Sequence, residues 1–123
     1  MQLVDQTDPH GPLIRRVAAD VIVVGIHEWR ESFLIQPGFE LEVWPAPPLT
    51  GFGLEQARAL LGRMPALVIL GCGALQAFPP PPFVVHLLSQ GVGLETMPNA
   101  AAARTFNLLV SEGRNVLGVF LLP

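Results

Sequence analysis

The sequence contains no lysine and only one cysteine, and each absence excludes a kind of chemistry. A Walker-type phosphate loop is excluded, because that loop needs a lysine that reaches the phosphates. Cys72 stands alone, which excludes an internal disulfide and a zinc site built from several thiolates. A single thiol is compatible with a reducing compartment, so we expect a cytoplasmic protein. Cys72 could act as a nucleophile only beside a base, and His86 is the nearest histidine in the sequence, although sequence spacing does not give their distance. We favour a buried, inert thiol.

Charge is also scarce. Charged residues make up 14% of the chain, against a usual share of about 25%. The chain has seven scattered arginines and a net charge of -3, so it lacks the basic surface expected of a nucleic-acid-binding protein. Much of the surface must then be apolar or neutral, and such surface is often covered by another molecule. We therefore predict a protein partner and self-association, as in a homodimer, and no nucleic-acid partner.

No hydrophobic run is long enough to cross a membrane. The longest nearly uncharged runs, near Val21–Ile26 and Pro65–Leu75, fall short of the length that a bilayer requires. The first residues lack the basic and then apolar order of a secretion signal. We therefore expect no membrane insertion. Residues 1–123 fit a single domain, and the 50% of hydrophobic residues suffices for one core.

The first half of the sequence is typical of strands. The run Val21–Val24 is β-branched throughout, as in a strand that is buried on both faces. Ser32–Ile35 and Leu41–Trp44 are predicted strands on either side of the turn signal Pro37–Gly38. The polar segment His27–Glu31 lies between apolar strands, so we predict a solvated hairpin loop there in preference to an acid–base site.

The second half alternates helices with strands. Strands are predicted at Ala66–Leu70, Val92–Met97 and Val116–Leu121, and helices at Leu54–Met64, around Val84–Leu88 and from Asn99 onward. This order suits right-handed crossovers that place helices on a mixed sheet. The predicted fold class is therefore α/β or α+β.

The last third of the chain is the most informative. Asn99 is a residue type that caps helices through its side chain, the alanines after it favour helix, and Gly113 suits a left-handed exit. The stretch Asn99–Arg114, preceded by Leu70–Gly73 and Gly91–Met97, resembles a small family of uncharacterised bacterial and archaeal proteins. That family includes the mitochondrial respiratory complex I assembly factor three and an adipogenesis-associated paralogue.

The resemblance extends from the Val21 strand to the end of the chain. It implies a single domain of mixed β-sheets packed together, with about three helices on one side. It implies no known enzyme activity, and the mitochondrial relative acts as an assembly helper through protein contacts. Ala103 and Phe106 stand where the family often has cysteine and tyrosine. These two differences argue against a thiol-based or phenol-based reaction in this chain, because alanine has no thiol and phenylalanine has no phenol.

One stripe of the last helix is polar. Arg104, Asn107 and Ser111 recur at helical spacing, as in an anion-binding face or in an ordinary solvated face, and the second interpretation is favoured. Leu108 lies beyond this stripe and either contacts a partner or is an ordinary exposed leucine.

The turn Gly71–Gly73 follows a predicted strand, where ligands bind in open α/β sheets, although a plain tight turn explains it as well. Glu95 is expected to pair with Arg104 or Arg114, or to act as a carboxylate in a pocket beside Met97. The three histidines lack the spacing of metal ligands, so we predict no metal and no cofactor. The candidate binding residues are Gly71, Gly73, Glu95, Met97, Asn99, Arg104, Asn107 and Leu108.

Two functions stay open. The first is a non-catalytic binding or assembly module, which by extension of the resemblance would help to assemble respiratory complexes. The second is a small-molecule-binding protein or minor enzyme, with a pocket near the Gly71–Gly73 turn and Glu95 or Arg104. No recognisable set of catalytic residues supports the enzyme, so the binding module is favoured.

Overall fold

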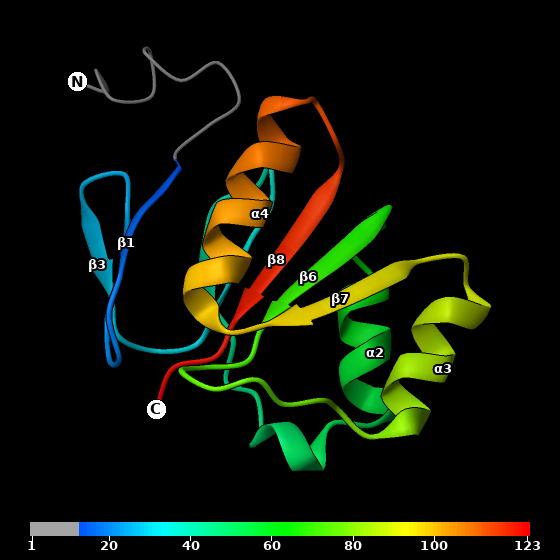
Figure 1. Ribbon diagram of the computed structural model, residues 1–123. Helices are drawn as coiled ribbons and strands as arrows, with labels where there is room; N and C mark the ends of the chain where they lie inside the picture. The colour runs from blue at the N-terminus through cyan, green and yellow to red at the C-terminus, as the bar shows by residue number, and fades with distance from the viewer. Residues whose placement is uncertain (1–12) are drawn as a thin grey trace.

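The computed structural model describes residues 13–123, and His10 lies outside this range. Two sheets and three α-helices form the fold (Figure 1). The helices are α2 (Leu54–Leu61), α3 (Pro81–Ser89) and α4 (Asn99–Ser111), with a short 3-10 turn at Leu49–Gly51. The strands are β1 (Ile14–Val17), β2 (Ile22–Val24), β3 (His27–Trp29), β4 (Phe33–Ile35), β5 (Glu42–Val43), β6 (Leu67–Gly71), β7 (Gly93–Met97) and β8 (Val116–Phe120).

The smaller sheet is antiparallel, in the order β1-β2-β3, and the larger sheet has the order β5-β4-β8-β6-β7. Within the larger sheet β6 runs parallel to β7 and to β8, whereas β4 runs antiparallel to β8 and to β5. α3 connects β6 to β7 and α4 connects β7 to β8, as in parallel crossover units. The predicted class, a single domain of mixed sheets and three helices, is confirmed.

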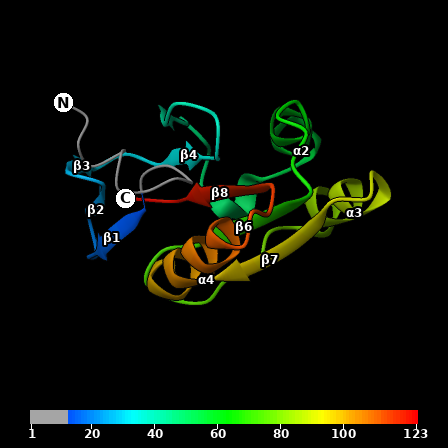
Figure 2. The ribbon, with the colours of Figure 1, turned by 90° about the horizontal axis from the view of Figure 1, so that it is seen from above.

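The larger sheet separates two hydrophobic cores. One core lies between this sheet, α4 and the smaller sheet, and the other lies between the sheet, α2 and α3. Consecutive residues of β8 alternate between them, since Val116 and Phe120 face α4 while Leu117 and Val119 face α2 and α3. The helices therefore cover both faces of the larger sheet (Figure 2), which corrects the expectation that they lie on one side.

The polar segment His27–Glu31, predicted as a loop, contributes strand β3. Its residues pair with β2 in the register Ile22↔Trp29 and Val24↔His27, across a turn that contains Gly25 at φ +60°. Trp29 packs on the core while His27 and Glu28 are exposed. The loop prediction was wrong because an outer hairpin strand needs only one apolar side chain to be anchored.

Helix α4 begins at Asn99, as predicted, but Asn99 does not cap it. Pro98 occupies the N-cap position and makes no side-chain capping bond, and the Asn99 side chain is bonded elsewhere. The exit is confirmed, because Gly113 has φ +77° directly after the last turn. Across residues 13–123, no helix combines the length and apolar character needed to cross a bilayer.

Candidate functional site

Three strands end together at one edge of the larger sheet, and Asn99 joins their ends. Its side chain accepts a hydrogen bond from the Gly73 N–H (3.1 Å) and donates one to the Leu121 carbonyl (2.9 Å). Its backbone N–H donates to the Gly73 carbonyl (2.8 Å). Only 4% of Asn99 is exposed. A buried amide with both of its groups bonded has a structural role that local sequence rules do not reveal.

The Gly71–Gly73 turn packs against the side-chain amide of Asn99. A side chain at Gly71 would overlap the Asn99 Oδ1 atom and would come within 2.8 Å of the Phe120 ring. The N–H of Cys72 donates to the Met97 carbonyl, and the N–H of Gly73 is bonded to Asn99. Because these two amide donors are occupied, the arrangement favours the plain tight turn over a cradle for a phosphate.

Cys72 is half-buried beside the same turn. Its Sγ lies 3.2 Å from the carbonyl oxygens of Leu75 and Met97, and the Ala77 N–H donates to it at 3.3 Å. These contacts hold the segment after β6 against β7. They agree with the interpretation of Cys72 as a structural thiol.

A cavity of about 600 Å³ opens at this edge of the sheet. It lies between the proline-rich segment after β5, the turn after β6 and the last residues of the chain. No charged side chain lines it. The lining residues are Ala19, Ser32, Ala46, Pro47, Pro48, Leu49, Cys72, Gly73, Ala74, Leu121, Leu122 and Pro123.

Two smaller cavities lie beside the first, with volumes of about 220 and 210 Å³. The first of these shares Ala19, Gly73 and Ala74 with the large cavity and is also lined by Asn99. The second lies between β1 and α4, where Arg104 is one of its lining residues. The three cavities therefore follow one another along the edge of the fold.

Asn107 attaches β1 to α4 beside the last of these cavities. Its Oδ1 accepts from the Ile14 N–H (3.0 Å) and its Nδ2 donates to the Ile14 carbonyl (2.8 Å). A stripe of solvated side chains was the favoured prediction for Arg104, Asn107 and Ser111. For Asn107 that prediction was wrong, because its amide satisfies the backbone of a strand 93 residues away in the sequence.

Some of the other candidate residues lie close to one another and some do not. Met97 contacts Cys72 and, through its sulfur, the hydroxyl of Thr105. Glu95 is exposed on β7, and among the ion pairs of residues 13–123 none joins it to Arg104 or Arg114. The predicted ion pair is thus corrected. Leu108 is exposed on α4, away from the cavities.

The exposed face of α3 and the segment before it are apolar. Leu75, Phe78, Val85 and Leu88 are 80%, 74%, 61% and 56% exposed, and Pro81 is exposed on the same helix face as Val85 and Leu88. We call these five residues the α3 surface. No Asp, Glu, Lys or Arg occurs between Arg63 and Glu95. Helix α3 lies at the end of the molecule opposite the smaller sheet (Figures 1 and 2).

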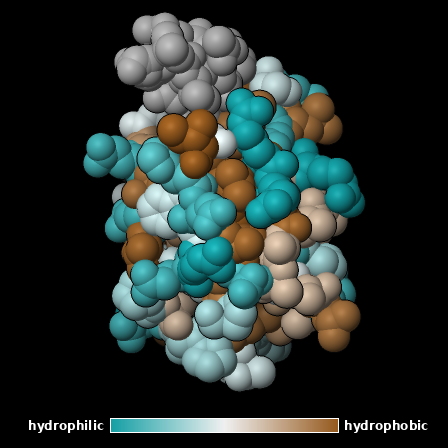
Figure 3. Space-filling model, turned by 90° about the vertical axis from the view of Figure 1, so that its left-hand side faces the viewer, coloured by the Kyte–Doolittle hydropathy of each residue, from teal (hydrophilic) through white to brown (hydrophobic). Residues whose placement is uncertain are grey.

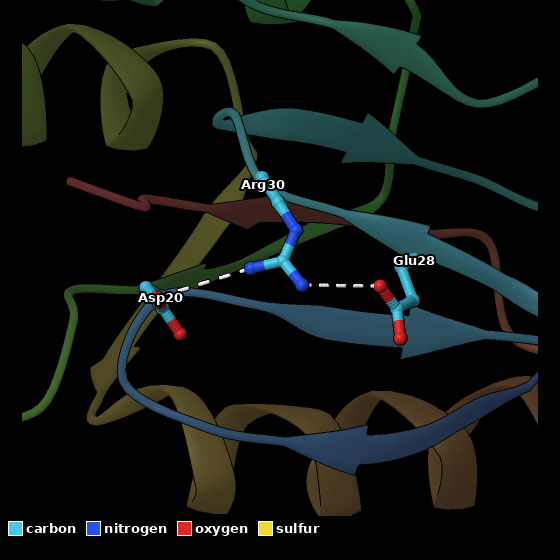
Figure 4. Close-up of polar contacts among 3 residues, drawn as sticks. All are labelled: Asp20, Glu28 and Arg30. Carbon is cyan, nitrogen blue, oxygen red and sulfur yellow. Dashed lines mark hydrogen bonds and ion pairs between the residues drawn. The ribbon is translucent and has the colours of Figure 1, made fainter.

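The opposite end is richer in charge. Figure 3 shows that hydrophilic residues cover much of the side formed by the smaller sheet, with hydrophobic residues visible between them. Arg30 lies 3.8 Å from Asp20 and 3.1 Å from Glu28 (Figure 4), and all three side chains are mostly exposed. Such ion pairs contribute little to stability. Within the described residues no three His, Cys, Asp or Glu side chains are grouped as metal ligands.

Residues 14–121 match the protein family described as "Protein of unknown function (DUF498/DUF598)". The chain belongs to this family. An uncharacterized protein from Rhodobacter capsulatus is 44% identical over 87 residues, which are 70% of this chain and 68% of that protein. A 13 kDa major membrane protein of Francisella tularensis is 33% identical over 57 residues, 46% of each chain.

Solved structures show the same fold. A protein of Xanthomonas campestris superposes with a TM-score of 0.84 and 34% identity, over 99% of this chain and 92% of that one. A Bordetella pertussis protein described as an Mth938-like domain superposes with a TM-score of 0.76 and 23% identity, over 89% of this chain and 85% of that one. The fold is therefore Mth938-like, as in uncharacterised bacterial relatives.

Proposed function

We propose that this protein is a non-catalytic protein-binding module that helps to assemble protein complexes. The α3 surface is the observation that carries this proposal. It contains large exposed apolar side chains, and it lies within a stretch of 31 residues that has no Asp, Glu, Lys or Arg. Exposed apolar surface of this kind is typical of protein interaction sites, because water contact with it is unfavourable until a partner covers it.

The resemblance to a mitochondrial assembly factor supports the same class of function. By extension, this chain would take part in building respiratory complexes in its own host. The proposal includes a cytoplasmic location, with binding to membrane complexes from that side. A Francisella relative carries the word membrane in its name, and a protein that binds membrane-bound intermediates would co-sediment with membranes without inserting. Deletion of the gene with no effect on respiratory enzyme assembly would exclude this extension.

Affinity purification from the native host at native expression level tests the binding module. The double variant Val85→Asp/Leu88→Asp places charge on the α3 surface, and both positions are exposed, so folding is retained. Ile26→Asp is the matched control, because Ile26 is 71% exposed on the smaller sheet. We expect a stoichiometric partner that is kept by the control and lost by the double variant.

Leu108→Asp and Arg104→Glu extend the same experiment to the last helix. Loss of the partner only in these two variants would move the binding surface from α3 to α4. Recovery of the protein alone, in every sample, would contradict the binding module. Circular dichroism of each purified variant verifies its fold.

A second candidate function is small-molecule binding, and the cavity of about 600 Å³ favours it. Its volume lies within the range of about 300–1,000 Å³ that is usual for ligand sites. Gly73 lines two of the adjoining cavities, Asn99 lines the middle one and Arg104 lines the last one, whereas Glu95 lines none of the three. This candidate therefore involves Gly73 and Arg104 without a carboxylate from Glu95.

A further inference from the structure

The three cavities adjoin one another along the edge of the fold, and we call this row of cavities the trench. The large cavity shares Ala19, Gly73 and Ala74 with the middle cavity, and the middle cavity shares Val17 and Ala100 with the last one. The trench therefore runs from the end of the chain, past the start of α4, to the space between β1 and α4. We call its two ends the apolar end and the arginine end.

The apolar end has no charged side chain, and some of its hydrogen-bonding groups are already bonded. Its hydroxyl, on Ser32, already accepts from the Leu122 N–H at 2.9 Å and lies 3.4 Å from the Leu122 carbonyl. The amides of Cys72 and Gly73 are bonded to Met97 and Asn99. An alkyl chain needs no hydrogen-bonding partner, so it suits a lining without charged side chains.

The arginine end is shaped by an irregularity in β1. Ile14 pairs with Val24 and Arg16 pairs with Val23, so two steps along β1 match one step along β2. The residues of β1 around this bulge line the cavity, and Arg15 and Arg16 are both among them. Bulges are known to redirect side chains beside binding sites.

Arg104 reaches the same cavity from α4. None of Arg15, Arg16 and Arg104 forms an ion pair with another residue of the described range. The first turn of α4 adds a weak positive potential from its N-terminal backbone. Guanidinium groups bind carboxylates through paired N–H donors, so three of them at one end of the trench select a negative head group.

We propose that the trench binds a long-chain carboxylate, with its head group at Arg15, Arg16 and Arg104 and its alkyl chain in the apolar cavity. This inference rests on the second candidate function, and it names the ligand class for that candidate. The match is between a ligand with one charged end and a trench whose charged side chains all lie at one end. Neither a free anion nor an uncharged alkane uses both ends.

Isothermal titration of the full chain with sodium dodecanoate, below its micellar concentration, tests the proposal. Butanoate and inorganic phosphate serve as head-group probes, and dodecyltrimethylammonium serves as the probe of the same chain length with opposite charge. We expect saturable one-to-one binding of dodecanoate only. Equal binding of the cationic amphiphile would overturn the proposal, as would absence of dodecanoate binding.

Variants locate the site. The double variant Arg16→Glu/Arg104→Glu is expected to weaken dodecanoate binding by about tenfold or more. Arg58→Glu is the control, because Arg58 is exposed on α2, and it should leave dodecanoate binding unchanged. Ala74→Trp, at an exposed position lining two of the cavities, is expected to block the alkyl chain. Dodecanoate binding that survives both trench variants but is lost in Val85→Asp/Leu88→Asp would mean adsorption on the α3 surface and would contradict the trench.

Failure here is distinguishable from failure of the other proposals. Another small molecule could bind where dodecanoate does not, with its binding abolished by Ala74→Trp. In that case the proposed ligand class is wrong and the small-molecule function stands. The partner-capture experiment changes Val85 and Leu88 on α3, and neither residue lines any of the three cavities, so its outcome does not depend on the trench.

Discussion

Replacement of Asn99 by alanine is expected to destabilise the protein strongly, although it does not lower the helix propensity of the first turn of α4. The change removes two side-chain hydrogen bonds, to the Gly73 N–H and to the Leu121 carbonyl, at a residue that is 4% exposed. Alanine is the best helix former, so the first turn of α4 loses nothing in propensity. The loss therefore measures how much the amide contributes by joining the strand ends.

The magnitude follows from the two groups left without partners. Each buried polar group that loses its partner costs about 1–3 kcal/mol, and both groups here are partly buried, so water compensates part of the loss. We expect a decrease of about 2–4 kcal/mol in the free energy of unfolding. Against a typical total of about 5–15 kcal/mol, this is a large fraction of the stability.

Urea denaturation followed by circular dichroism measures the effect, with Ser111→Ala as the control on the exposed side of the same helix. The control is expected to change stability by less than about 0.5 kcal/mol. Gly71→Ala in the Asn99→Ala background should cost less than Gly71→Ala alone, because the overlap with Oδ1 is gone. A loss below about 1 kcal/mol for Asn99→Ala, or strict additivity of the two changes, would refute the reasoning.

Other perturbations test separate parts of the fold by urea denaturation. Gly118→Ala places a Cβ within 2.8 Å of Ile35, so we expect overpacking to cost about 1–3 kcal/mol, and an unchanged midpoint would contradict this. Met64→Gly relieves a positive φ of 53° at an exposed side chain and should stabilise by about 0.5–1 kcal/mol, whereas a loss would show that Met64 packs in solution. Asn107→Ala should increase hydrogen exchange at the Ile14 amide at least tenfold, with the α3 amides unchanged as the internal control.

The larger sheet was predictable because its central strands carry strong patterns. The segments of β6 and β8 are apolar at almost every position, and both were identified within one residue at each end. The same continuous pattern indicates burial on both faces, which requires helices on both sides of the sheet. The expectation of one helical side came from the resemblance, whereas the reasoning from the residues placed helices on a mixed sheet without assigning them to a side.

The smaller sheet and the site were harder to predict because their determinants are not local. β1 contains Arg15 and Arg16 side by side, which breaks the alternation that identifies a strand, and its bulge depends on pairing with β2. Asn99 matched a capping rule, yet its amide bonds groups 22 and 26 residues away. No sequence window contains both partners, so only the folded arrangement reveals this role.

The most direct test of the protein-binding proposal is site-specific photo-crosslinking in the native host. A photoreactive amino acid replaces Leu88 on the α3 surface in one strain and Ile26 on the smaller sheet in another, since both positions are exposed. The proposal predicts a discrete crosslinked adduct from position 88 and none from position 26. No adduct from position 88, or the same adducts from both positions, would contradict a binding surface on α3.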